Sequence, residues 1–168
     1  MIKRNTVARE RFNITAVRQE NRIGITVTAK EQKHSLVLLL ASQLMKRSLS
    51  IDIFVLHCKG NNITVSAILD NSVEITPDQL TNIAAEIRQI TGDAASVRIH
   101  NPVAKLAIFG HGLCTSRRTS TEIFDKIRKA GQNIEMMSIS ENEINLIFPP
   151  SAELGRIVEI LSKKVSKW

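Results

Sequence analysis

The sequence contains one pattern twice, and this internal repeat limits the folds open to the chain more than any other feature. The first copy covers residues 23–69 and the second covers residues 104–148. When Ile51-Asp52-Ile53 is aligned with Ile134-Glu135-Met136, the copies match without a gap at an offset of 83 residues (51 to 134). Each copy of such a repeat is one supersecondary unit with its own order of elements. We therefore expect two units of one fold.

Each copy has the order strand, helix, two strands, helix. Residues 23–29 and 103–110 are β-branched and apolar, as expected for strands. Tight turns at residues 59–62 and 140–143 then join two strand-like runs in each copy, which predicts hairpins. The residues that mark the helices are Ile123, Phe124, Ile127 and Ala130 with Gly131 at the C-cap, Thr76 and Pro77 before Leu80, Ile83, Ile87 and Ile90, and Pro149-Pro150-Ser151 before Leu154, Ile157 and Leu161.

With one more strand, this order is the βαββαβ topology of ferredoxin-like folds. Residues 95–101 supply the last strand of the first copy, whereas the second copy is followed only by the polar residues 162–168. The N-terminal strand of residues 13–18 can fill the missing place. We therefore predict an α+β fold with two antiparallel sheets, in which strand exchange inserts one unit into the other.

The first helix of the first copy, residues 35–45, is apolar nearly all round. A helix of this kind is covered on more than one side. Packing between the two repeats is one explanation and a subunit interface is another, and the two are compatible.

The net charge of +7, from 23 basic and 16 acidic residues, favours polyanions, acidic partners or anionic ligands. The basic residues are densest in the first dozen residues, at residues 117–129 and at the C-terminal end, and such groups also occur on ordinary solvated faces. Single-stranded RNA stacks on aromatic side chains of sheets with this topology. Because the chain has no tyrosine and its second hairpin offers only Phe148, RNA binding is the weaker interpretation.

Cellular location and thiol chemistry follow from what the sequence lacks. No run approaches the roughly 20 apolar residues that span a bilayer, and residues 1–12 have no apolar core of a secretory signal. We therefore expect a cytoplasmic protein. Cys58 and Cys114 are far apart and form no C-x-x-C, which predicts reduced thiols without a disulfide or a zinc site.

Residues suited to catalysis are scattered. His57 and Cys58 are neighbours on a predicted strand, so their side chains point to opposite faces. His34 and His111 occupy related strand-to-helix loops, where histidines are commonly solvated. Gly110-x-Gly112 lacks the third glycine of a dinucleotide fingerprint, and no G-K-[ST] occurs. We therefore expect a protein that is not an enzyme and holds no cofactor or metal.

The strand-to-helix loops, residues 32–36 and 113–119, are the best candidates for a binding site. Free N-H groups at a helix start form a receptor for a carboxylate. In the second copy, Gly110 and Gly112 permit close approach of the backbone, and Arg117 and Arg118 can add charge-assisted bonds. A small anionic or zwitterionic ligand fits this pattern. The alternative is a strained turn beside two solvated arginines.

The second copy resembles the last ACT domain of aspartate kinases. The segment "NIEMMSISENEINL", residues 133–146, matches the part of that family that follows the helix. The N-terminal strand, the first copy and "HNPVAKLAIFGHGL", residues 100–113, also follow the order of the family, so that the resemblance covers nearly the whole chain. It extends to the regulatory ACT pair alone, as in the small β subunit of some bacteria, and no segment corresponds to the kinase domain.

The resemblance implies two ACT domains, one inserted into the other. Residues 20–101 would form the inserted first domain, and residues 12–19 with 102–168 the second. Residues 1–11 would be a flexible basic segment. In the family, ligands lie between ACT units of two chains, held by a D-x-P-G loop, a helix start, a glutamine and an Asn-Ile pair.

Carried onto this sequence, the family site keeps the Asn-Ile pair and replaces the other motifs. Gln32-Lys33-His34-Ser35 stands in place of D-x-P-G, Leu56-His57 in place of Gln-Asn, and Arg117-Arg118 in place of Pro-Gly. Without a carboxylate at position 32, the ammonium group of a ligand loses a natural partner. The candidate ligand-binding residues are Gln32, His34, Ser35, Leu36, Leu56, His57, Gly112, Ser116, Arg117, Arg118, Asn133 and Ile134.

The sequence thus supports three hypotheses of different classes. The first is an aspartokinase-like regulatory protein, dimeric through ACT-ACT sheet pairing, that binds an amino acid or related small anion and acts on a kinase or another biosynthetic enzyme. The second is an assembly module whose altered loops bind nothing. The third is nucleic-acid binding through basic charge, which steep salt dependence would reveal.

Overall fold

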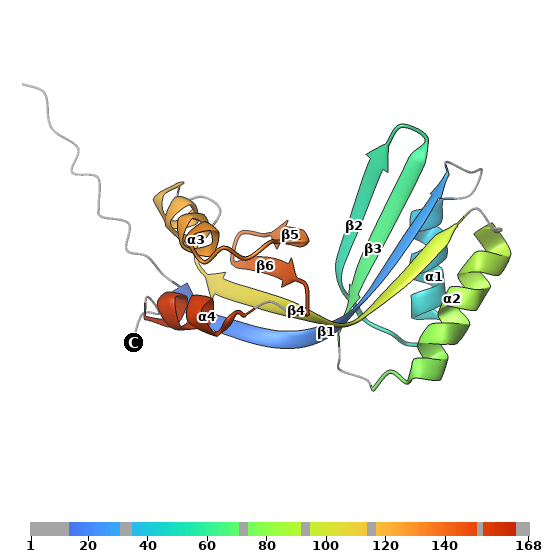
Figure 1. Ribbon diagram of the computed structural model, residues 1–168, viewed down its shortest axis with the longest axis horizontal. Coiled ribbons are helices and arrows are strands. Elements are labelled where there is room, and N and C mark those ends of the chain that lie inside the picture. The colour runs from blue at the N-terminus through green and yellow to red at the C-terminus, as the bar shows by residue number, and fades with distance from the viewer. Residues whose placement is uncertain are drawn as a thin grey trace, which may run out of the picture. The chain divides into compact units, whose positions relative to one another are not determined.

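The computed structural model describes residues 14–30, 35–70, 74–91, 95–113, 117–150 and 153–163 (Figure 1). The basic segment of residues 1–11 lies outside this part of the chain. The elements in chain order are β1 (Ile14–Lys30), α1 (Leu36–Met45), β2 (Ile51–Lys59), β3 (Asn62–Leu69), α2 (Pro77–Thr91), β4 (Ser96–Gly110), α3 (Arg117–Lys129), β5 (Met136–Ile139), β6 (Glu143–Phe148) and α4 (Gly155–Ser162).

The chain divides into two compact units. The central unit consists of residues 21–104, and the flanking unit consists of the residues before and after that span. Strands β1 and β4 contribute residues to both units. The six strands form one sheet in the order β2-β3-β1-β4-β6-β5, in place of the two sheets that the repeat predicts, because β1 and β4 run through both units. Each unit thus contains two helices and four strands or parts of strands, and the insertion of one unit into the other by strand exchange stays a prediction.

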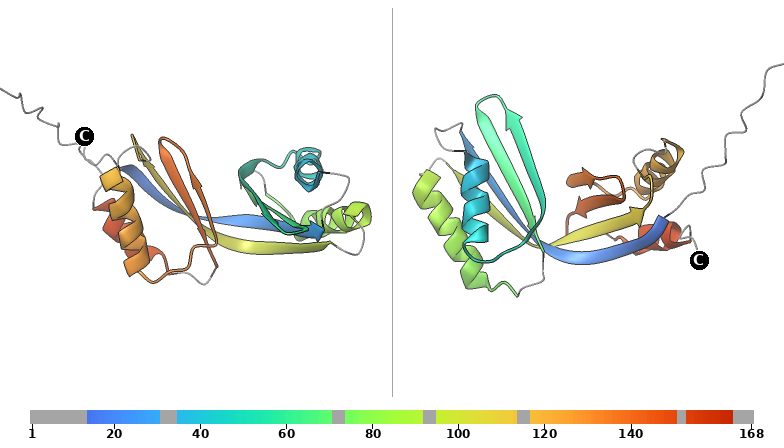
Figure 2. Two further views of the ribbon diagram at one scale, coloured as in Figure 1. Left: turned by 90° about the horizontal axis from the view of Figure 1, so that it is seen from above. Right: turned by 180° about the vertical axis from the view of Figure 1, so that it is seen from behind.

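In the central unit, helices α1 and α2 pack on one face of the sheet (Figure 2). The alternation of side chains along a strand explains which residues face them. Ile23, Ile25 and Val27 of β1 point into the core, and the intervening Thr26 and Thr28 point to the other face. The core of this unit comprises Ile23, Ile25, Val27, Ala29, Leu36, Leu40, Leu44, Leu49, Val65, Ala67, Leu69, Leu80, Ile83, Ala84, Ile87, Ala95 and Val97.

Local sequence signals set the turns and caps of the central unit. Strands β2 and β3 are antiparallel, with Lys59 opposite Asn62, and Gly60 in the turn has φ of 58°. Glycine adopts this left-handed conformation without the penalty that a side chain brings. Thr76 caps α2, because its hydroxyl accepts from the Gln79 N-H at 3.3 Å and Gln79 Oε1 accepts from the Thr76 N-H at 2.9 Å. This reciprocal capping box confirms the predicted helix start.

In the flanking unit, the amphipathic helix α3 buries Ile123 and Ile127, and α4 buries Ile157 and Leu161. Gly131 has φ of 71°, which confirms the predicted C-cap after α3. Strands β5 and β6 form an antiparallel hairpin. Other buried apolar residues of this unit are Ile14, Leu106, Ala107, Ile108, Leu113, Ile144, Leu146, Ile147, Phe148 and Leu154.

In two places, two strands that were predicted separately form one continuous strand in the structure. Residues 14–18 and 23–29 fall within β1, and residues 96–101 and 103–110 fall within β4, which includes a cis peptide bond between Asn101 and Pro102. The polar residues 18–22 separate the two apolar runs of β1 in sequence. A strand tolerates polar side chains where they reach solvent, as Arg18 and Gln19 do.

Helix α1 is only partly covered. Leu36, Leu40 and Leu44 are buried on the face toward the sheet, whereas Leu38 and Met45 are 70% and 71% exposed. The expectation that this helix is covered on more than one side thus stays a prediction about a partner surface.

Candidate ligand loops at the helix starts

The start of α1 is fixed by Ser35. This residue has an extended backbone (φ −62°, ψ 109°), and its hydroxyl accepts from the Leu38 N-H at 3.4 Å. The Ser35 carbonyl accepts from the Leu39 N-H at 3.0 Å, which closes the first turn. The first turn contains no acidic side chain. The partial positive charge of this helix end is therefore not offset by a carboxylate of its own first turn, and an anion would be favoured there.

Two other predicted residues of this loop, Gln32 and His34, lie outside the described residues. Leu36, in contrast, is buried and lines a small cavity beside the helix start. The free volume of about 10 Å³ corresponds to roughly one water molecule. A side chain of a ligand does not fit into this cavity unless the walls move. The lining residues are Ala29, Lys30, Leu36, Leu39, Ile63, Ile90 and Thr91.

Leu56 and His57 lie on opposite faces of the edge strand β2. Leu56 is paired with Val65 of the core, so it points to the helix side, and it is 53% exposed. His57 is paired with Thr64, whose hydroxyl lies 3.0 Å from that of Thr28 on the other face. The central unit therefore does not bring Leu56 and His57 to one point, and a ligand held at one face touches one of them.

The other face of this sheet carries a polar ladder that the sequence analysis does not name. Thr26 and Ser66 are directly opposite, with their hydroxyl oxygens 3.0 Å apart, and Thr28 and Thr64 form the next rung. His57 continues the row on β2. Alternating Thr and Ser in two neighbouring strands was the sequence signal for this ladder.

In the flanking unit, the loop before α3 is held by its own hydrogen bonds. Gly112 has φ of 67° and Leu113 is fully buried. Ser120 of α3 donates a short hydrogen bond to the Leu113 carbonyl, which ties the loop to the first turn of the helix. Ser116 lies outside the described residues. A role of this loop in ligand binding stays a prediction.

Arg117 and Arg118 are the first two residues of α3. Arg117 is exposed and has no ion-pair partner among the residues that the structure describes; its carbonyl accepts from the Thr121 hydroxyl at 2.8 Å. The side chain of Arg118 is outside the described part. The first turn of α3 has no acidic residue. A cation at a helix N-terminus raises the local positive potential, so both the helix end and Arg117 attract an anion.

Asn133 and Ile134 lie between α3 and β5. Asn133 is exposed and Ile134 is half-buried. The next residue, Glu135, donates from its N-H to the Ile147 carbonyl at 2.8 Å, so the pair stands directly before the β5-β6 ladder. The candidate residues of the described chain thus form two sets, Ser35, Leu36, Leu56 and His57 in the central unit and Gly112, Arg117, Arg118, Asn133 and Ile134 in the flanking unit.

Across the described ranges, no three His, Cys, Asp or Glu side chains gather closely enough to hold a metal ion. Among the helices that the structure describes, none has the length and apolar character needed to cross a membrane.

Comparison with known proteins shows a regulatory-subunit fold. No protein-family model matches the sequence. The chain is 22% identical over 161 residues to an aspartokinase of Geobacillus stearothermophilus, and this match covers 95% of the chain and 38% of the relative. The chain thus spans about two fifths of the length of that curated relative.

Solved structures extend this likeness. The regulatory subunit of aspartate kinase from Thermus thermophilus, in a ligand-free form, superposes with a TM-score of 0.75 at 17% identity, covering 91% of this chain and 99% of that one. Aspartokinase III of E. coli, in complex with lysine and aspartate, gives 0.65 at 14% identity, covering 95% of this chain and 35% of that one. The resemblance to the regulatory region of aspartate kinases is confirmed at the level of the fold, and the Thermus thermophilus neighbour, which is covered over almost its full length, is a regulatory subunit.

Proposed function

We propose that this chain is an aspartokinase-like ACT regulatory protein that binds a small anionic metabolite or an amino acid at its helix-start loops and thereby regulates a partner enzyme. The observation that carries the proposal is the match to a regulatory subunit over 91% of this chain and 99% of the other. Such a protein acts on its partner only if the ligand binds two conformations with different affinity. The proposal includes a kinase or another biosynthetic enzyme as the partner.

The local chemistry favours a ligand more anionic than lysine. Both leading helices start without an acidic side chain, and α3 starts with two arginines. Position 32 is a glutamine, so a carboxylate that could bind the ammonium group of a ligand is missing there. We therefore expect organic dicarboxylates and acidic amino acids to bind more tightly than lysine and threonine.

Two surfaces of the central unit support dimer formation as part of the proposal. Strand β2 is at the end of the strand order, and an edge strand offers unpaired backbone groups to another strand. Beside it in the chain, α1 exposes Leu38 and Met45. Pairing of two chains through this edge and this helix would cover apolar surface that is otherwise in water.

A thermal-shift panel of amino acids and organic anions tests ligand binding. A ligand at about 100 times its dissociation constant adds about 2.7 kcal/mol to the free energy of unfolding. We expect a dicarboxylate or an acidic amino acid to raise the melting temperature, and Arg117→Ala to reduce the rise. Arg128→Ala is the matched control, because Arg128 is an exposed arginine on the same helix that pairs with Asp125 at 3.2 Å. A panel without any response would contradict the proposal.

The small volume of the cavity beside Leu36, about 10 Å³, favours the second candidate function, an assembly module that binds no ligand. This candidate predicts that Arg117→Ala and His34→Ala leave binding of the partner intact, whereas polar substitutions on the exposed face of α1 abolish it. Sensitivity of the partner to the loop variants would exclude it.

A further inference from the structure

The flanking unit has an open groove between α3 and α4. Its volume is about 270 Å³, and it is lined by Lys126, Lys129, Ala130, Arg156 and Ile160. The other two side chains of this lining are apolar, and no carboxylate is among the lining residues that the structure describes. This groove is separate from the candidate ligand residues that the structure describes, since none of them lines it.

The neighbouring carboxylates of the groove pair with cations outside its lining. Of the nearby acidic residues, Asp125 pairs with Arg128 at 3.2 Å and Glu159 pairs with Lys163 at 2.6 Å. The hydrogen bond from Lys163 and its charge lower the pKa of Glu159, with a smaller contribution from the charge of Arg156. Within the described ranges, Lys126, Lys129 and Arg156 take part in no ion pair.

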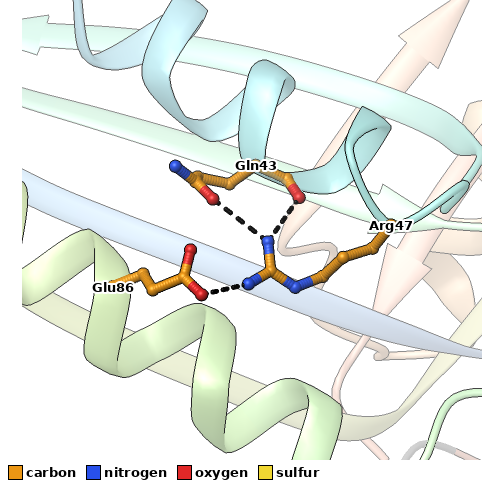
Figure 3. A network of polar contacts seen from close by, with 3 residues as sticks. All are labelled: Gln43, Arg47 and Glu86. Carbon is orange, nitrogen blue, oxygen red and sulfur yellow. Dashed lines mark hydrogen bonds and ion pairs between the residues drawn. The ribbon is translucent and has the colours of Figure 1, made fainter.

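The related groove of the central unit, with a volume of about 410 Å³, is lined by charged and polar side chains that include an ion pair (Figure 3). There Arg47, directly after α1, donates to the Gln43 carbonyl at 2.9 Å, to Gln43 Oε1 at 3.0 Å, and in a short contact to Glu86 of α2. The guanidinium is thus held by an acceptor on each helix. That groove also contains Gln79, Asn82, Ala85 and Gln89.

The internal repeat shows what replaces this ion pair in the flanking unit. The alignment that relates the two copies places Ala130 at the position of Arg47. The buried residues of α2 and α4 correspond in their spacing, with Leu154, Ile157 and Leu161 matching Leu80, Ile83 and Ile87, and this match places Ile160 at the position of Glu86 and Arg156 at that of Asn82. The ion pair of one unit is therefore an apolar pair in the other, with cations around it.

We propose that the α3-α4 groove is a docking site for an acidic amphipathic segment of a partner protein. The half-buried Ile160 and Ala130 would receive one apolar side chain, and Lys126, Lys129 and Arg156 would bind carboxylates on either side of it. Helix pairs commonly receive a partner in this way, with apolar anchors at the centre and charges at the rim. The inference does not depend on ligand binding at the helix-start loops.

The lining discriminates against other anionic partners. A free phosphate would use the cations and leave the apolar floor unused. Single-stranded nucleic acid gains affinity by stacking its bases on aromatic side chains, and none of the described lining residues is aromatic. The volume is just below the roughly 300 to 1,000 Å³ of small-molecule sites, which suits a few side chains of a segment that continues outside the groove.

Peptide display against the full-length chain tests the proposal. A library of random 12-residue peptides is selected on the wild-type protein, with the variant Lys126→Gln/Lys129→Gln/Arg156→Gln as the competitor in solution. We expect the enriched peptides to carry an apolar residue flanked by Asp or Glu, and to bind the triple variant about tenfold more weakly than the wild type. Enriched peptides without acidic residues, or equal binding to both proteins, would overturn the proposal.

Matched variants distinguish binding in the groove from general electrostatic attraction to the basic protein. Lys46→Gln/Lys59→Gln/Arg98→Gln removes three exposed charges of the central unit, and it should keep the affinity within twofold. Ala130→Arg/Ile160→Glu rebuilds the ion pair of the central unit across the groove, and it should abolish binding although the groove cations remain. Salt-dependent binding of a dT20 oligonucleotide that is lost in the groove variant, with no acidic peptide selected, would instead assign the site to nucleic acid. In the triple groove variant, the ligand-induced rise in melting temperature should persist. The peptide test and the test of the helix-start loops can therefore fail independently of each other.

Discussion

Replacing the two exposed apolar residues of α1 should dissociate the proposed dimer without unfolding the chain. Leu38 and Met45 are 70% and 71% exposed. Full burial of such a side chain contributes about 1.5 to 3 kcal/mol, so covering the exposed part contributes about 1 to 2 kcal/mol for each residue. In a twofold interface each residue occurs twice, which gives about 4 kcal/mol or more for the dimer. Only part of such a sum appears as affinity.

We therefore expect Leu38→Ser/Met45→Ser to weaken the dimer at least about a hundredfold, at 1.4 kcal/mol for each factor of ten. Sedimentation equilibrium over a range of concentrations measures this constant. Because both side chains are exposed in the single chain, the free energy of unfolding of the monomer should fall by only about 1 kcal/mol, mostly through helix propensity. Ile90→Ser, at a 48% exposed position on α2, is the control. An unchanged dimer constant in the double variant would refute the proposed interface.

Three further predictions concern stability and are checked by urea unfolding. Leu40→Ala removes a fully buried side chain between α1 and the sheet and should cost about 2 to 5 kcal/mol of unfolding free energy. Thr76→Ala removes the hydroxyl that caps α2 and should cost about 1 kcal/mol, whereas Thr76→Ser should cost little. Gly60→Ala places a side chain at φ of 58° and should cost about 1 kcal/mol although no atom lies near the new methyl group, so a neutral result would contradict a left-handed turn at this position.

The turns and caps of this fold were accessible from sequence because each depends on one residue type. Gly60 and Gly131 mark positions of positive φ, and Thr76 with Pro77 marks a helix start. The continuity of β1 and β4 was not accessible in this way. The polar residues 18–22 are compatible with a loop or with a solvated stretch of strand, and only the pairing of neighbouring strands distinguishes the two.

The candidate site was predicted less completely than the fold. Strand alternation alone places Leu56 and His57 on opposite faces, so that a family motif of two adjacent residues does not guarantee that both reach one ligand. Conversely, the groove between α3 and α4 depends on residues from two helices, and its apolar floor becomes visible only when Ala130 and Ile160 are compared with Arg47 and Glu86 of the other unit. The sequence shows where the basic residues are, but it does not show which of them form ion pairs in the fold.

Amide chemical shifts of the full-length chain, recorded while an organic dicarboxylate such as succinate or an acidic amino acid such as L-aspartate is added, test the central claim most directly. Anion binding at the helix starts predicts saturable shifts of the amides of residues 35–38 and 117–120, where each leading helix begins. The same titration of Arg117→Ala should show weaker saturation at the start of α3. Shifts confined to other surfaces, or no saturable shift with any member of the panel, would contradict the claim that these loops are the ligand site.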